Sequence, residues 1–178
     1  MYGVVPAMQT PKDELSRVSK AYQKITYDGQ SKEVFAKEHG WKCLGAGAYK
    51  AAFAVSRYHV VKIVHDEADD DITNEVKFHK KLAKKYPHLQ KFFLKPIMWD
   101  EENKIPQWIV YPRAIPLKPY YNETTTTPEG VEAQKHAAEE LAETGILGEH
   151  SDITHHDRNW GFYLGKPVVL DTGCETLK

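Results

Sequence analysis

The sequence has few cysteines, no long apolar run and no marked excess of charge of either sign. Cys43 and Cys174 are its only cysteines, too few for a disulfide framework or a cysteine-based zinc cluster, so a reducing compartment fits. No apolar run approaches the roughly 20 residues that a membrane-spanning helix needs. Residues 1–15 lack a basic region followed by a long apolar stretch. We therefore expect no secretory signal and a cytoplasmic protein without a membrane partner.

Length and charge balance narrow the classes further. The chain has 178 residues, of which 41% are hydrophobic and 28% are charged, as in ordinary globular proteins. This length fits one domain, which can have two lobes, and it is enough to bury a core. The 24 Lys and Arg against 25 Asp and Glu give a net charge of -1. This balance argues against a strongly basic nucleic-acid-binding protein and leaves only a local basic patch open.

Hydrophobic periodicity predicts alternating helices and strands. Apolar residues at helical spacing predict helices in four places, which are residues 10–25, 31–40, 69–86 and 127–145. Runs of β-branched and aromatic residues predict strands in the following stretches: three within 41–64, then 92–99, 107–111, one around Phe162 and one at 168–170. At the first helix Thr10 can act as the cap and Pro11 as the first helical residue. This order of elements predicts an α+β fold.

Two glycines, Gly45 and Gly47, lie between the first two predicted strands. Glycines let backbone N–H groups approach phosphate oxygens, because no side chain stands in the way. The motif is not a Walker loop, since no Gly-Lys-Ser/Thr follows it. Taken alone, this Gly-x-Gly pattern fits a phosphate-binding turn and equally an ordinary tight turn without a ligand.

A lysine and a glutamate stand where charge is unusual. Lys62 lies in the middle of the apolar run of residues 60–64, where an unpaired ammonium would be costly to bury. On a helical wheel of residues 72–86, Glu75 falls inside the apolar arc and five lysines fall opposite. A carboxylate facing the core needs a partner, and we expect Lys62 to provide it. The alternatives are a solvent-facing Lys62 on an edge strand and a Glu75 that reaches solvent at the edge of the apolar stripe.

Polar residues suited to catalysis and metal binding gather near the C-terminus. Residues 150–161 hold His150, Asp152, His155, His156, Asp157 and Asn159, and Asp171 follows an apolar strand. Carboxylate and amide oxygens on neighbouring loops suit Mg²⁺, with substrate phosphates completing its shell. An aspartate at a reacting hydroxyl can act as the base. A zinc site built from His150, His155, His156 and Asp157 is the alternative, although these residues show no regular ligand spacing.

These features occur in the order found in protein kinases: glycine turn, strand lysine, helix glutamate, then H-x-D, N and D-x-G. Over about residues 41–175 the sequence resembles the protein-kinase-like superfamily. It is most similar to small kinase-like proteins of phage and bacterial origin and to the aminoglycoside-phosphotransferase branch, whose catalytic loop reads D-x-H-x-x-N. The resemblance implies a minimal two-lobed fold that binds ATP and Mg²⁺ between its lobes. It divides the chain into a helical extension (1–40), an antiparallel N-lobe sheet with one helix (41–111) and a reduced helical C-lobe (112–178).

The resemblance also implies roles for residues of the N-lobe. Gly45 and Gly47 would lie over the phosphates of ATP. Lys62 would contact the α- and β-phosphates and would be held by Glu75. Val110 would belong to the hinge that contacts the adenine ring.

In the C-lobe the resemblance implies that Asn159 and Asp171 hold Mg²⁺. His156 matches the histidine of the catalytic loop, three residues before the asparagine. The chain continues for seven residues after Asp171. We therefore expect the activation segment and further helices of the family to be missing, which would leave almost no platform for a peptide substrate.

The catalytic base departs from the family pattern. The family has its aspartate five residues before the asparagine, where this sequence has Thr154, and threonine cannot accept a proton as a carboxylate does. Asp152 lies seven residues before Asn159 in an H-x-D motif. Either the loop carries two extra residues and Asp152 is the base, or the base is lost, with Asp157 a weaker third candidate.

Two functions from different classes follow. The first is an ATP-dependent phosphotransferase acting on a protein or a small molecule, since Lys62, Glu75, Asn159 and Asp171 are all present. The second is a pseudokinase-type binding module that engages and inhibits a partner protein, for which the resemblance implies a phage origin. The displaced aspartate and the expected lack of further helices favour it. The shortened second lobe would leave an apolar surface, which a homodimer or another protein could cover.

Overall fold

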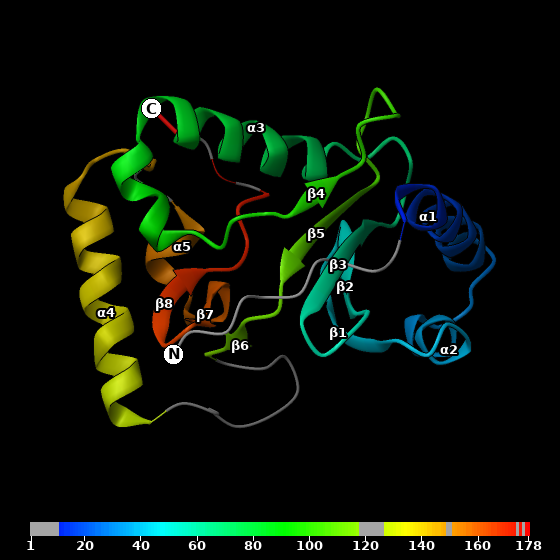
Figure 1. The fold of residues 1–178 in the computed structure, drawn as a ribbon, viewed down its shortest axis with the longest axis horizontal. Helices are drawn as coiled ribbons and strands as arrows, with labels where there is room; N and C mark the ends of the chain where they lie inside the picture. The colour runs from blue at the N-terminus through cyan, green and yellow to red at the C-terminus, as the bar shows by residue number, and fades with distance from the viewer. Residues whose placement is uncertain (1–10, 118–126, 149–150, 174, 176) are drawn as a thin grey trace. The chain divides into compact units, whose positions relative to one another are not determined.

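A computed structural model of the chain describes residues 11–117, 127–148, 151–173, 175 and 177–178. The fold of this part is α+β, as the sequence predicts, with five α-helices and two antiparallel sheets (Figure 1). The chain divides into two compact units. Unit 1 comprises Met1–Thr73 and Pro96–Arg113, and unit 2 comprises Asn74–Lys95 and Ala114–Lys178. The division falls inside one helix, α3 (Asp71–Lys85).

Unit 1 contains an antiparallel sheet of five strands in the order β1-β2-β3-β5-β4. The strands are β1 (Lys42–Ala46), β2 (Lys50–Ala54), β3 (His59–Val64), β4 (Met98–Trp99) and β5 (Trp108–Pro112). The first three form the meander that the glycine-punctuated run of residues 41–64 predicts. β3 lies between β2 and β5, so its backbone hydrogen-bonds to a neighbouring strand on either side.

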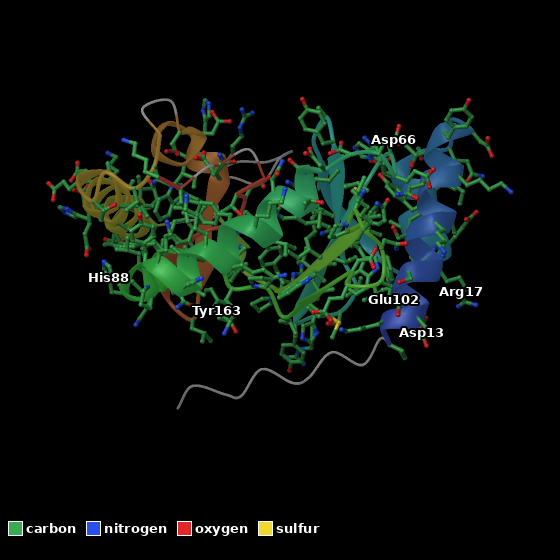
Figure 2. The ribbon with its side chains drawn as sticks, turned by 90° about the horizontal axis from the view of Figure 1, so that it is seen from above. Asp13, Arg17, Asp66, His88, Glu102 and Tyr163 are labelled. Carbon is green, nitrogen blue, oxygen red and sulfur yellow. The ribbon has the colours of Figure 1, made fainter. Side chains whose placement is uncertain are left out.

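One face of this sheet packs against α1 (Lys12–Tyr27) and α2 (Lys32–Glu38), which bring Tyr22 and Phe35 into a shared core (Figure 1). The strand residues in that core alternate along each strand and are Ala51, Phe53, Val61, Ile63, Trp108 and Val110. On the outer side of α1, Arg17 points away from the sheet (Figure 2). Both helices of the predicted N-terminal extension thus share the core of unit 1.

The register places a second set of residues on the opposite face of the sheet. Lys62 pairs with Ala52 on β2 and with Ile109 on β5. Directly opposed residues share a face, and so do residues two apart on one strand. The face of Lys62 therefore also carries Lys50 and Tyr111.

The helix starts in unit 1 follow local capping chemistry. Ser31 Oγ accepts the Val34 N–H at 3.2 Å and caps α2. α1 begins one residue later than predicted, because Pro11 is its N-cap residue and makes no side-chain capping hydrogen bond. Thr10, predicted as the cap, lies outside the described residues.

Unit 2 combines most of α3 with the helix α4 (Pro128–Glu143) and a three-stranded sheet in the order β6-β7-β8. Its remaining elements are η1 (Pro87–Phe92), β6 (Ile115–Pro116), α5 (Asp152–His155), η2 (Asp157–Asn159), β7 (Trp160–Tyr163) and β8 (Lys166–Val169). The core of unit 2 joins Phe78 of α3, Leu141 of α4 and Trp160 of β7. This unit holds the segment to which the sequence assigns catalysis.

The helix α4 follows its sequence signals closely. Thr127 Oγ1 accepts the Gly130 N–H at 3.3 Å, and Gly145 ends the helix with a φ of 65°. Leu141 is fully buried, and Val131 packs against the same core. None of the described helices combines the length and the apolarity that crossing a membrane requires.

The predicted strand over residues 92–99 is wrong for most of its length. Only Met98 and Trp99 form a strand there, and Pro87–Phe92 form the 3-10 helix η1. Phe92 and Phe93 are consecutive and both buried in the unit-2 core. A half-buried strand would alternate buried and exposed residues, which Phe92 and Phe93 do not. The apolar run at this position belongs instead to an irregular segment that crosses the core.

Candidate functional site

The glycine turn between β1 and β2 is closed by its own hydrogen bonds. The Gly47 N–H donates to the Lys50 carbonyl at 2.9 Å, so this amide is engaged within the turn. Gly45 lies within β1 at a register shift, where the strand bulges. A Cβ added at Gly47 would meet only the Lys50 carbonyl oxygen, at 3.9 Å. Neither packing nor a left-handed backbone therefore requires glycine at position 47.

His65 ties this turn to α1. Its backbone N–H donates to the Tyr49 carbonyl at 2.9 Å, and its ring Nε2 lies 3.0 Å from the Gly47 carbonyl. Its other ring nitrogen, Nδ1, lies 2.9 Å from the hydroxyl of Tyr22. Burial lowers the pKa of His65 and raises the pKa of Tyr22 to about 12. Both groups are therefore neutral at neutral pH, and sequence reasoning did not single out either one.

Lys62 is a buried lysine on the central strand β3. Its residue is only 8% exposed, and its Nζ lies 5.0 Å from the centroid of the Tyr111 ring. An ammonium over an aromatic face at this distance is a cation–π contact. The alternative that Lys62 lies on the solvent face of an edge strand is wrong, because β3 has neighbours on both sides.

A second lysine, largely buried, lies on the same sheet face. Lys50, the first residue of β2, forms an ion pair with Asp71 in the first turn of α3. The side chains are 11% and 6% exposed. Sequence reasoning did not single out this pair. Lys50 and Lys62 thus place two cationic groups on one face of unit 1.

Glu75 is fully buried in α3. The alternative that it reaches solvent at the edge of the apolar stripe is therefore wrong. Glu75 belongs to unit 2 and Lys62 to unit 1, so their predicted pairing stays a prediction.

Val110 lies on the sheet face opposite to Lys62. Its side chain belongs to the core shared with α1 and α2, and its carbonyl accepts the Ile97 N–H at 2.8 Å. The β5 residues on the face of Lys62 are Ile109 and Tyr111. A nucleotide role for Val110 stays a prediction, and the strand alternation adds Tyr111 to the candidates.

In unit 2 the catalytic-like segment folds into the short helix α5. Ser151 Oγ accepts the Ile153 N–H at 3.2 Å and caps the helix. Asp152 is exposed, and its Oδ1 lies 3.5 Å from Nε2 of His156. His150, the first residue of the H-x-D motif, lies outside the described residues, as do the side chains of Thr154 and His155.

The two predicted metal ligands lie close together in the backbone of unit 2. The Asn159 side-chain amide donates to the Asp152 carbonyl at 3.2 Å. The Leu170 N–H donates to the Asn159 carbonyl at 2.7 Å, which brings Asn159 next to the residue before Asp171. Asp171 Oδ1 accepts the Gly173 N–H at 3.2 Å. Asn159 and Leu170, eleven residues apart in the sequence, therefore meet beside the residues predicted to bind Mg²⁺.

These donors suit magnesium better than zinc. Carboxylate and amide oxygens are hard ligands, and Mg²⁺ needs only one or two of them beside waters and phosphates. Thr172 adds a buried hydroxyl, which has no hydrogen-bond partner among the described residues. Zinc usually takes four protein ligands in a structural site. The described part of the chain holds no group of three or more His, Cys, Asp or Glu side chains that could bind a metal ion.

Glu175 is a buried carboxylate that sequence reasoning missed. Its Oε1 accepts the Ile153 N–H at 3.3 Å, and its own N–H donates to the Thr172 carbonyl at 3.1 Å. Glu175 therefore connects the segment of Asp171 to the start of α5. No signal in the sequence pointed to it, because its partner lies 22 residues away.

Comparisons with known proteins give no family for this chain. No protein-family model matches it, and no curated protein matches it.

Proposed function

We propose that this protein is a minimal kinase-like phosphotransferase, which binds ATP with Mg²⁺ and transfers a phosphoryl group to a protein or a small molecule. The observation that carries the proposal is the burial of Lys62 on the central strand of an antiparallel sheet. Removing an ammonium group from water carries a desolvation penalty of about several kcal/mol, even when the group is paired. A lysine kept at such a cost is typical of a site that binds an anion.

The order of the elements along the chain supports this proposal. In protein kinases the phosphate-binding lysine stands on the third strand, and a helix after that strand carries its glutamate. Here Lys62 stands on β3, and the next helix, α3, carries the buried Glu75. Phosphate groups need cations and backbone N–H donors, and Lys62 supplies a cation on the face of the sheet that also carries the Lys50–Asp71 ion pair.

Unit 2 offers the residues for the chemical step. Asp152 is exposed and would take the proton of the acceptor hydroxyl. The oxygen of that hydroxyl would at the same time bond to the γ-phosphorus of ATP. The bond from that phosphorus to the β–γ bridging oxygen breaks, and ADP leaves. Asn159 and Asp171 would hold Mg²⁺, which neutralises the charge on the phosphate oxygens when bound.

A binding module without catalysis is the second candidate. The Gly47 N–H is engaged with the Lys50 carbonyl, so this turn leaves one fewer amide for a phosphate. Asp152 lies two residues further from Asn159 than the family pattern requires. Both observations favour a scaffold that holds a partner protein without phosphoryl transfer.

Calorimetric titration of Mg²⁺-ATP into the full chain tests the proposal. Lys62→Met keeps the volume of the side chain and removes its charge, and we expect it to lose saturable binding. Lys37→Met is the matched control, because Lys37 is exposed on α2, which covers the other sheet face. Absence of binding by the wild type would overturn the proposal.

A second measurement separates the two candidates. We expect Asp152→Asn to bind Mg²⁺-ATP as the wild type does and to release ADP at least about 100-fold more slowly. Asp157→Asn tests the weaker candidate base and should keep the wild-type rate if Asp152 is the base, and Glu143→Gln, at an exposed position of α4, is the matched control. Wild-type binding without any ADP release or phosphoryl transfer would favour the binding module.

A further inference from the structure

Lysines are concentrated in one part of unit 2. Between Glu75 and Asp100 the sequence has seven lysines, two histidines and no aspartate or glutamate. The rest of the chain then holds 17 Lys and Arg against 25 Asp and Glu. A chain with a net charge of -1 therefore carries a strongly basic segment, and a sum over the whole sequence conceals it.

The helix α3 exposes most of this charge on one face. Four lysines of α3 are exposed, and we call them the basic face: Lys77, Lys80, Lys84 and Lys85. The opposite face buries Phe78 and Leu82 in the unit-2 core, so the orientation of the helix is fixed. At 1.5 Å per residue the basic face extends for about 12 Å. His88, exposed just beyond the helix, follows it (Figure 2).

The spacing of the lysines along α3, Lys81 included, works against the helix itself. Lys77 and Lys81, Lys80 and Lys84, and Lys81 and Lys85 are all four residues apart, where like charges repel. A glutamate in any of these pairs would instead stabilise the helix. Lysines near the C-terminal end gain from the helix dipole, but Lys77 lies too far from that end. This repulsion would be relieved by a polyanion bound along the helix.

The chemistry of the basic face indicates which polyanion fits. Protein interfaces are depleted in lysine and enriched in aromatic residues, and membrane-surface helices insert apolar side chains. Apart from the lysines, the exposed residues within residues 76–95 are Ala83, Pro87 and His88. A phosphodiester backbone, in contrast, can be bound by cationic side chains spaced along a line, without aromatic or apolar contacts.

We propose that the basic face of α3 binds the phosphate backbone of a nucleic acid independently of its base sequence. Duplex DNA and single-stranded RNA share this backbone, and the experiment distinguishes them. The proposal concerns unit 2 alone and holds or fails separately from ATP binding.

Fluorescence anisotropy with the full chain tests the proposal, using a labelled mixed-sequence DNA duplex and a labelled single-stranded RNA. Four phosphate contacts predict a slope of log affinity against log salt between about -3 and -4 on duplex DNA, and somewhat less on a single strand. The triple variant Lys77→Glu, Lys84→Glu, Lys85→Glu should lose more than about 100-fold in affinity at about 100 mM salt. The probe that binds more tightly shows whether the basic face prefers duplex DNA or single-stranded RNA.

A charge-matched variant is the control. Lys20, Lys24 and Lys37 are exposed on α1 and α2, and changing all three to Glu alters the net charge equally. This control should keep its affinity within about threefold, since its lysines contact no phosphate. If the charge reversal prevents folding, a triple variant with glutamine in place of glutamate replaces it: Lys77→Gln, Lys84→Gln, Lys85→Gln.

Three outcomes would overturn the proposal. The first is no binding of either probe at about 50 mM salt, where phosphate contacts are strong. The second is an equal loss of affinity in the control variant. The third is equally tight binding of polyglutamate or of phosphatidylserine vesicles, which would make the basic face a general anion surface.

Discussion

The hydroxyl of Tyr22 lies 2.9 Å from Nδ1 of His65, and the other ring nitrogen of this histidine lies 3.0 Å from the Gly47 carbonyl. A neutral ring satisfies both contacts, since Nε2–H donates to the carbonyl and Nδ1 accepts from the hydroxyl. Tyr22 is fully buried in the core of unit 1. One histidine thereby connects the core helix α1 to the glycine turn.

The stability of the protein should depend on the protonation of His65. Burial lowers its pKa below the ordinary value of 6.5 and outweighs the hydrogen bond to the Gly47 carbonyl, which raises it; Lys32 lowers the pKa further and Asp69 raises it. The unfolded chain therefore binds the proton more readily, and stability falls as the pH drops below about 6.5 toward the folded pKa. We expect the free energy of unfolding of His65→Gln to fall less than that of the wild type on acidification. Urea unfolding at about pH 7.5 and 5.5 measures this, and equal pH dependence in both proteins would contradict it.

Removal of the Tyr22 hydroxyl should weaken the same connection. Tyr22→Phe keeps the ring in the core beside Phe35 and Phe53, whose ring centroids lie 5.0 and 5.3 Å away. The change leaves Nδ1 of His65 without this donor, so we expect a loss of about 1 kcal/mol. Tyr27→Phe is the control, because Tyr27 is 93% exposed on the same helix. An unchanged urea midpoint in Tyr22→Phe would argue against the hydrogen bond.

The ion pair of Lys50 and Asp71 should be costly to break. Both side chains are nearly buried, so removing one partner leaves the other charge uncompensated. Lys50→Met and Asp71→Leu should each destabilise the protein by about 3–5 kcal/mol, and the double variant should recover most of that loss. Lys12 and Glu101 form an exposed pair at 2.7 Å, and Lys12→Met should cost under about 1 kcal/mol. Additive effects in the Lys50 and Asp71 double variant would contradict the coupling.

Local signals in the sequence predicted the parts of the fold that depend on neighbouring residues. The caps at Ser31 and Thr127 and the stop at Gly145 act within four residues of their partners, so the sequence contains all the information for them. The apolar environments of Lys62 and Glu75 were also visible, because alternation along a strand and the helical wheel assign a face. Their burial is confirmed.

Contacts between distant segments could not be predicted in this way. Asp71 and Lys50 are 21 residues apart, and Tyr22 and His65 are 43 apart. Which residues meet depends on strand register and helix packing, which a single sequence does not specify. Register likewise places Tyr111 on the face of Lys62, which a single sequence did not indicate.

Gly161 should be required by packing within unit 2. A Cβ at this position would lie 2.6 Å from the Ile115 carbonyl oxygen and 2.9 Å from Cδ1 of Leu170. Because β6 pairs with β7 here, the backbone of Ile115 can move only by breaking that pairing. We expect Gly161→Ala to lose about 1–3 kcal/mol. Gly148→Ala is the control, since nothing lies within 4 Å of a Cβ there; equal thermal stability of both variants would refute the close approach.

Glu175 should position α5, and with it Asp152. Its buried carboxylate accepts the Ile153 N–H at 3.3 Å, at the positive end of that short helix. Glu175→Ala removes this acceptor, and we expect a loss of about 1–2 kcal/mol. Glu175→Gln keeps an acceptor oxygen and should recover part of the loss. The exposed Glu143 on α4 supplies the control variant Glu143→Ala, which should match the wild type in chemical denaturation. If Glu175→Gln and Glu175→Ala were equally destabilised, the negative charge and not the hydrogen bond would stabilise α5; if neither lost stability, Glu175 would not hold Asp152 in place.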